Sequence, residues 1–148
     1  MLEECIEALA IKPDGVYVDG TAGGAGHSQA IAQRLPAKGR LIALDKDPDA
    51  IKAATQRLAP YPQAKVVQSD FCNVDTVLDA LGIAGMDGIL LDLGVSSHQL
   101  DCAERGFSYQ HNAKLDMRMS QEGMSAWNIV NEWDERQIAR ILREYAEE

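Results

Sequence analysis

The chain has 148 residues, of which 46% are hydrophobic, so it is long enough to form one globular domain with a substantial core. Its formal net charge of −9 argues against a protein that holds nucleic acid mainly through a basic face, because neutralising phosphates needs clustered Lys and Arg. The three cysteines form no C-x-x-C pair, which argues against a disulfide framework or a zinc site and favours a reducing, cytoplasmic environment.

Helical segments alternate with short apolar runs along the first 92 residues. Leu2, Ile6 and Leu9 recur at helical spacing, and the acidic start lacks the features of a signal peptide. Four apolar runs then predict strands, and segments with helical character follow the first three, including residues 27–35 and 49–58. Strands that alternate with helices predict an α/β fold with an open parallel sheet. The four runs are VYVD at 16–19, LIALD at 41–45, KVV at 65–67 and GILLD at 88–92.

The pattern changes after residue 92. Residues 94–124 are rich in turn residues without a clear period, and two short helices are predicted at 125–131 and 134–145. We therefore predict a partial sheet domain over residues 1–100 and a loop with the start of a helical part over 101–148. Four strands make a thin open sheet, so we expect the chain to be a fragment, and no apolar stretch is long enough to cross a membrane.

Polar residues follow each predicted strand at its carboxyl end, where open parallel sheets bind ligands. The first strand ends in Asp19 and runs into a glycine-rich turn over residues 20–26 that opens a helix. Such a turn lets free amides meet a carboxylate or phosphate, and its alternative interpretation is a tight turn without a ligand. Asp45 lies 22 residues after Gly23, where an acid commonly holds two ribose hydroxyls. Phe71 could cover an adenine face, and Asp92 ends the fourth run.

Two classes of cofactor fit such a site. A dinucleotide needs a G-x-G-x-x-G turn, but the corresponding positions here are Gly24, Gly26 and Gln29, so the third glycine is missing. The cationic groups of S-adenosyl-L-methionine instead seek carboxylates. The sequence therefore favours the methyl donor, with a nucleotide-dependent oxidoreductase as the alternative.

Several blocks of the sequence resemble the MraW/RsmH family. They are Asp19, Thr21, Gly23 and GHS at 26–28, then DKDPDAI at 45–51, LDLGVSSHQLD at 91–101, RGFSY at 105–109 and LDMRM at 115–119. The resemblance implies a Rossmann-like class I methyltransferase that transfers a methyl group to a cytosine N4 in 16S ribosomal RNA, free or in the small ribosomal subunit. It also implies a helical insertion for RNA recognition, and a chain of about half the usual length. The implied donor-binding residues are Ala25, Gly26, His27, Asp45, Phe71, Asp92 and Gln99.

The residues that meet the target base are less sharply defined by the sequence. Asp92, Asp101 and Asp116 are candidates for the acceptor that faces the cytosine amine. Phe107 and Tyr109 could stack on the base or pack under their own loop. Arg105 and Arg118 could meet phosphate or pair with neighbouring acids, and no metal is expected. A donor-binding fragment that needs the rest of its protein for activity stays a further alternative.

Two positions depart from the family pattern. Ala25 stands where the family usually has glycine, which costs about 1 kcal/mol if the backbone there has a positive φ, unless Gly24 forms the turn instead. Lys114 replaces a proline before the LDMRM block, which removes one rigid element.

Overall fold

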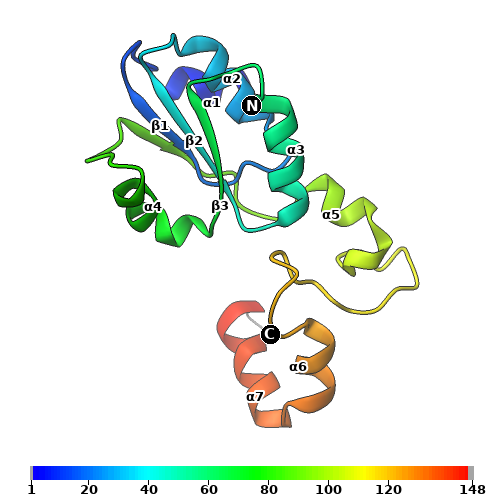
Figure 1. The fold of residues 1–148 in the computed structure, drawn as a ribbon. Coiled ribbons are helices and arrows are strands. Elements are labelled where there is room, and N and C mark those ends of the chain that lie inside the picture. Colours follow the sequence, from blue (N-terminus) through cyan, green and yellow to red (C-terminus); the bar gives the residue numbers. More distant parts are fainter. Residues whose placement is uncertain (1, 147–148) are drawn as a thin grey trace. The chain divides into compact units, whose positions relative to one another are not determined.

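The computed structural model describes residues 2–146, and the chain divides into two compact units, one up to Gly94 and the other from Val95. The first unit is an α/β structure whose four parallel strands lie in the order β3-β2-β1-β4 (Figure 1). The predicted open parallel sheet is therefore confirmed. The strands are β1 (Val16–Asp19), β2 (Arg40–Asp45), β3 (Ala64–Gln68) and β4 (Gly88–Leu90).

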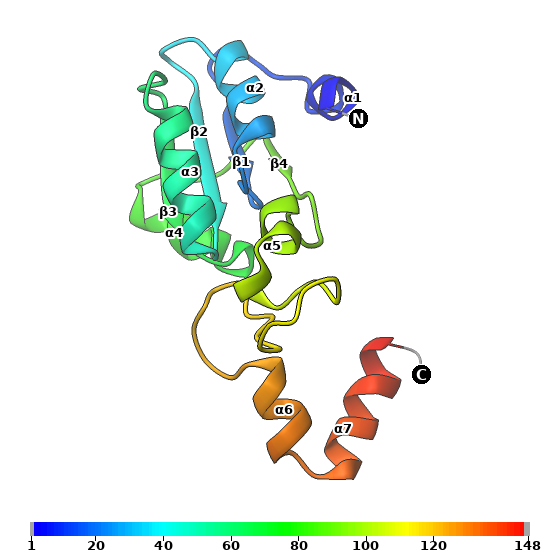
Figure 2. The ribbon, with the colours of Figure 1, turned by 90° about the vertical axis from the view of Figure 1, so that its right-hand side faces the viewer.

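Helices cover both faces of this sheet, as parallel strands require. One face packs against α1 (Leu2–Ala8), α2 (Gly26–Arg34) and α3 (Pro48–Leu58), and the other against α4 (Val74–Ala80), as Figures 1 and 2 show. Side chains alternate between the two faces, since Tyr17 joins the α2 and α3 side and its neighbour Val18 joins the α4 side. Central β1 and β2 are thus buried on both faces, as their apolar sequences predict.

The structure defines the start of α3 and the end of β4. Asp47 caps α3 by accepting a hydrogen bond from the Asp49 amide at 3.0 Å, and Pro48 begins the helix, as predicted. The fourth strand is shorter than predicted and ends at Leu90. The amide of Asp92 donates to Thr21 Oγ1 at 2.7 Å instead of joining the strand ladder, so Asp92 lies in the loop beyond β4.

The second unit consists of short helices joined by a long loop. The helices are α5 (Ser97–Asp101), the 3₁₀ turn η2 (Ala103–Arg105), α6 (Ala126–Glu132) and α7 (Glu135–Ile141), which continues as the π-helical turn η3 (Leu142–Ala146). The prediction missed α5 and η2, because five and three residues are too few to show a helical period. Another 3₁₀ turn in the first unit, η1 (Phe71–Asn73), follows β3. Among residues 2–146, no helix combines the length and apolar character needed to span a membrane.

Candidate donor-binding site

The first part of the candidate site is the turn between β1 and α2, which is organised by a buried carboxylate. Asp19 is fully buried, where one oxygen accepts from Ser28 Oγ at 2.5 Å and the other accepts from the Thr21 amide at 3.1 Å. Burial raises the pKa of the Asp19 carboxyl, and the hydrogen bond from Ser28 acts in the opposite direction. Asp19 therefore shapes the turn and is not exposed to a ligand, although its position at the strand end pointed to donor binding.

The turn itself uses two residues with left-handed backbone conformations. Gly23 has a φ of 49° and Ala25 a φ of 59°, so the prediction that Gly24 could form the turn in place of Ala25 is wrong. Ala25 is also the residue before α2, where it supplies no side-chain cap. The helices α3, α5, α6 and α7 each have a side-chain cap. The start of α2 thus offers backbone amides to a ligand, and a Cβ at exposed Gly26 would meet no atom within 4 Å.

Asp45 connects the glycine turn to the start of α3. Its Oδ2 accepts from the Gly23 amide at 2.8 Å, and its Oδ1 accepts from the Asp47 amide at 2.9 Å. The residue is partly exposed at the end of β2, so its carboxylate keeps room for further donors. Asp45 thus ties the glycine turn and the turn before α3 to one strand end, and its ribose-binding role stays a prediction.

The ends of β3 and β4 approach the same turn. A Cβ built on Gly20 would lie 2.5 Å from Leu91 Cδ2 and 3.0 Å from Phe71 Cβ, so both segments approach the turn closely here and a larger residue would need them to shift. Phe71 begins η1, which Asp70 caps through the Cys72 amide. Hydrogen bonding to that amide lowers the pKa of the Asp70 carboxyl, and Lys46 Nζ adds an ion pair at 3.2 Å. Phe71 is therefore held beside the glycine turn by a fixed segment.

The Asp92 segment lies beside the same turn. Its amide donates to Thr21 Oγ1, its side chain is 67% exposed, and its Oδ2 lies 3.9 Å from Nδ1 of His27. The carboxylate is thus free to meet a cation, in contrast to Asp19. Thr21 has a positioning role that the sequence argument missed, although a hydroxyl two residues beyond a strand end is a signal that could have suggested it.

Six of the seven predicted donor-binding residues lie together in the first unit. Ala25, His27 and Asp45 lie around the turn after β1, with Gly26, Phe71 and Asp92 beside them. Gln99 lies in the second unit, where its side chain is buried and its Oε1 accepts from the Ser96 amide at 3.0 Å in the capping box of α5.

The predicted substrate residues all belong to the second unit. Arg105 is buried and donates to the carbonyls of Arg118 and Met119, each at 3.0 Å. Arg118 forms a bidentate pair with Asp116, at 2.9 and 2.7 Å, which lowers the pKa of the Asp116 carboxyl. Both arginines therefore stabilise their own loop. The pairing of Arg118 with Asp116 is one of the two interpretations given for that residue, whereas Arg105 holds backbone carbonyls.

The remaining candidates are exposed to different degrees. Asp101 ends α5 and is exposed, Phe107 is partly buried, and Tyr109 is 97% exposed. Lys114, which stands where the family has proline, lies with its Nζ 5.1 Å from the centroid of the Trp127 ring. Within residues 2–146, no group of three or more His, Cys, Asp or Glu side chains is arranged to hold a metal ion.

A parallel sheet with a glycine turn after its first strand and acids at its strand ends is the architecture of class I S-adenosylmethionine-dependent methyltransferases. The O-methyltransferase TomG from Streptomyces achromogenes, solved in complex with SAM, shares this fold with a TM-score of 0.51 and 21% identity, over 62% of this chain and 42% of that chain. The model of the MraW methylase family matches residues 1–148, and the chain belongs to this family.

Curated relatives agree with this assignment. The Ribosomal RNA small subunit methyltransferase H of Lachnospira eligens is 55% identical over 150 residues, covering 100% of this chain and 48% of that protein. The protein of the same name from Clostridium botulinum is 52% identical over 149 residues, again with 100% and 48% coverage. The chain thus spans about half the length of the curated relatives it matches.

Proposed function

We propose that the complete protein transfers a methyl group from S-adenosyl-L-methionine to small-subunit ribosomal RNA, and that the first unit of this chain holds the donor. The observation that carries this proposal is the set of strand ends around the glycine turn. There Asp45 accepts from the Gly23 amide, and the exposed carboxylate of Asp92 lies near His27 at the uncapped start of α2. Family membership and the names of the curated relatives support the reaction and the substrate class.

Each part of the site has a role in this proposal. The amides at the start of α2, from Gly26 and His27 onward, suit the carboxylate of the donor. Asp45 would accept from the ribose hydroxyls, and Phe71 would pack on the adenine. Asp92 has an exposed carboxylate for the cationic methionine end. The bound donor supplies a methyl group activated by its positively charged sulfur.

We further propose cytosine N4 as the acceptor, following the family resemblance. The N4 amine would take up the methyl group that the bound donor would supply. The amine then loses a proton, which a nearby carboxylate can accept. Asp92 and Asp101 are exposed and suit this role better than Asp116, whose two oxygens are both engaged by Arg118. Orientation of the amine would supply most of the acceleration.

The second unit fits the beginning of an RNA-recognition part, since it carries the partly buried Phe107 and the exposed Tyr109 on a loop between short helices. The boundary that we propose for it is Val95, five residues after the end of β4.

Donor binding can be tested by calorimetric titration of the full-length protein with S-adenosylmethionine and, separately, with NADH. We expect binding of the methyl donor alone. Asp45→Asn should weaken it on the order of 100-fold, because a charged acceptor for two hydroxyls is lost while one acceptor oxygen remains for the turn. Asp79→Asn, an exposed carboxylate on α4, is the matched control and should bind as the wild type does.

The substrate is tested by transfer of a labelled methyl group to small-subunit ribosomal RNA from cells that lack the enzyme, followed by nucleoside analysis. We expect label in N4-methylcytidine. Preferred binding of NADH would support the oxidoreductase alternative and contradict the proposal, and label on a different nucleoside would contradict the cytosine N4 assignment alone.

A further inference from the structure

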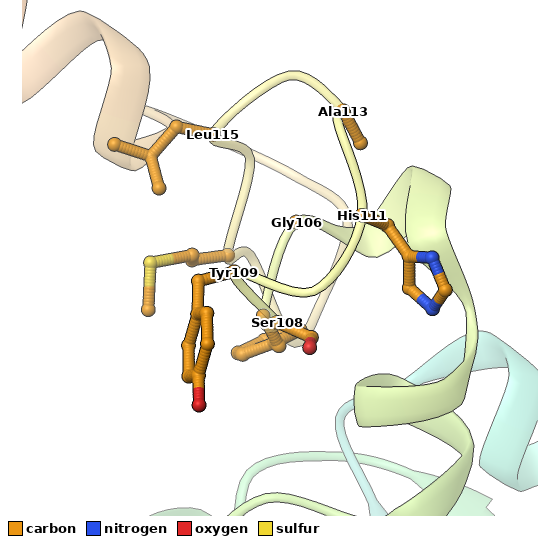
Figure 3. A pocket seen from close by; sticks show the side chains of 8 residues that line it. Gly106, Ser108, Tyr109, His111, Ala113 and Leu115 are labelled. Carbon is orange, nitrogen blue, oxygen red and sulfur yellow. The ribbon is translucent and has the colours of Figure 1, made fainter.

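The loop between η2 and α6 forms a pocket that is open to solvent and is not part of the candidate donor site. Its volume is about 310 Å³, and its lining includes Phe107, Tyr109, His111, Leu115 and Met117 (Figure 3). All of these residues lie in the second unit, within one stretch of twelve residues from Gly106 to Met117. This volume is at the lower end of the range of small-molecule sites, which suits a single base better than a whole cofactor.

The walls of this pocket are held in place by the backbone. The Met117 amide donates to the Arg105 carbonyl at 3.0 Å, and the buried Arg105 guanidinium binds the two carbonyls beyond it, so the loop is closed at its base. Gly106 has a φ of 70°, and a Cβ there would collide with the Lys114 carbonyl and lie 2.6 Å from the Asp116 amide. The two ends of the loop therefore pack backbone against backbone, and the side chains between them project from a fixed frame.

Tyr109 is the most exposed large side chain on this frame. Its ring is 97% exposed and projects from the loop in Figure 3, while the apolar Leu115 and Met117 in the same pocket are 39% and 45% exposed. An aromatic ring presented on a fixed loop beside apolar surface is the arrangement with which proteins stack on unpaired bases. His111 and Ser108 add polar groups to the lining, which can meet the edge of a base.

The segment that carries the pocket contains basic residues, which suits RNA as the partner. Residues 105–121 contain three basic residues and one acidic residue, whereas the whole chain has a formal net charge of −9. Arg105 is buried and Arg118 is paired with Asp116, so the exposed Lys114 is the basic side chain of this segment that could meet a phosphate flanking a bound base.

We propose that this pocket binds one unpaired base of an RNA strand, with the Tyr109 ring stacked on the base. The inference rests on the proposed function only in taking RNA as the substrate class, and it assigns the contact to a named ring on a loop fixed by Arg105. Phe107, whose ring lies 5.9 Å from the Arg105 guanidinium carbon, belongs to the frame.

The test is fluorescence anisotropy of the full-length protein with a labelled, unstructured oligoribonucleotide that contains cytosine, compared with the same sequence as a duplex. We expect Tyr109→Ala to weaken single-strand binding about 5-fold to 150-fold, and Tyr109→Phe to change it by less than about twofold, because the phenyl face still stacks. Tyr145→Ala is the matched control, since Tyr145 is 83% exposed in the same unit but lies outside the pocket, and it should bind as the wild type does.

The outcomes separate this inference from the proposed function. Unchanged single-strand binding by Tyr109→Ala, an equal loss in Tyr145→Ala, or the same dependence on Tyr109 with the duplex would each overturn the base pocket. S-adenosylmethionine titrations are run on every variant, and all should keep the affinity of the wild type. A protein that bound RNA through Tyr109 without any donor binding would keep the pocket and remove the methyltransferase assignment.

Discussion

Asp19 shapes the turn of the candidate donor site from a fully buried position. Both of its oxygens are used inside the protein, by Ser28 and the Thr21 amide, and this fixes the turn that leads into α2. The Thr21 hydroxyl in turn accepts a hydrogen bond from the Asp92 amide. A chain of hydrogen bonds therefore links the ends of β1 and β4, and the exposed carboxylate of Asp92 depends on it for its position.

The buried carboxyl of Asp19 gives a prediction about pH. Its pKa in the folded chain is raised above the ordinary value of 3.8, so between that value and the raised one the folded state binds more protons than the unfolded state. The stability that Asp19 contributes is thus fully present below the pKa of the unfolded chain. It is lost as the pH rises through the raised pKa of the folded chain. Asp19→Asn removes that loss, and its amide can still accept from Thr21.

We therefore expect the difference in melting temperature, Asp19→Asn minus wild type, to grow as the pH is raised from about 4 to about 7. Asp75→Asn, which changes an exposed carboxylate on α4, serves as the control and should show a much smaller trend. A difference for Asp19→Asn that stayed constant across this range would mean that burial does not raise the pKa of the carboxyl.

At single positions, the sequence predicted residues whose role follows from spacing. Asp45 was identified because acids at that distance from a glycine turn share a strand end, and Asp47 because it precedes Pro48. The burial of Asp19 and the role of Thr21 could not be predicted in this way, because both depend on which segments meet across the sheet. The pairing of Arg118 with Asp116 was foreseen only as one alternative.

The helix α2 illustrates how a local conflict is accommodated in an element. Ala25 adopts a left-handed conformation that costs an L residue about 1 to 2 kcal/mol. Its methyl group is fully buried in the core on the α2 side of the sheet, and burying one such group contributes about 0.8 kcal/mol. The packing of the methyl group therefore offsets much of the strain, which explains why alanine is tolerated where the family usually has glycine.

This balance predicts the effect of substitutions on the free energy of unfolding. Ala25→Gly should change it by less than about 1 kcal/mol, because relief of strain is opposed by the lost methyl contacts and the freer unfolded chain. Ala25→Val should lower it by about 2 to 5 kcal/mol, since a branched side chain adds crowding to the strain.

Ala30→Gly, in the same helix and also buried, is the matched control for the glycine substitution. It has no left-handed strain to relieve, so it should lower the free energy of unfolding by about 1 to 2 kcal/mol. Urea unfolding of the three variants measures these differences. Equal losses for the two glycine variants would contradict the strain at position 25.

Elements were predicted well where a period or a cap marked them. The four strands and the helices α1 to α4, α6 and α7 appear where their patterns placed them, with ends shifted by a few residues. In contrast, α5 depends on the Ser96–Gln99 capping box and has only five residues, so no repeat could reveal it. The strand β4 ends at Leu90, which pairs with Asp19 at the end of β1, and no local pattern records this pairing.

At the scale of the whole molecule, the two compact units are joined by an exposed apolar segment. Leu93 and Val95 are 67% and 46% exposed, and Gly94 between them has a φ of 132°. Thermolysin cleaves before apolar residues, so we expect its first cuts in the native chain to fall before Leu93 or Val95. Mass spectrometry of early fragments should show one piece for each unit.

A variant with Leu93→Asp and Val95→Asp provides the control, and it should resist cleavage in this segment while its folding is checked by circular dichroism. First cuts within the loop of residues 106–117 would contradict the prediction and the fixed conformation that we assign to that loop.

The strand β4 has a further consequence for the isolated chain. Among the described residues it pairs only with β1, and Ile89 and Leu91 at this border are 36% and 43% exposed. Unpaired peptide groups next to apolar side chains allow a strand edge to pair with another chain. We therefore expect association between folded copies of the chain, and not unfolding, to limit the concentration at which its solution stays monodisperse.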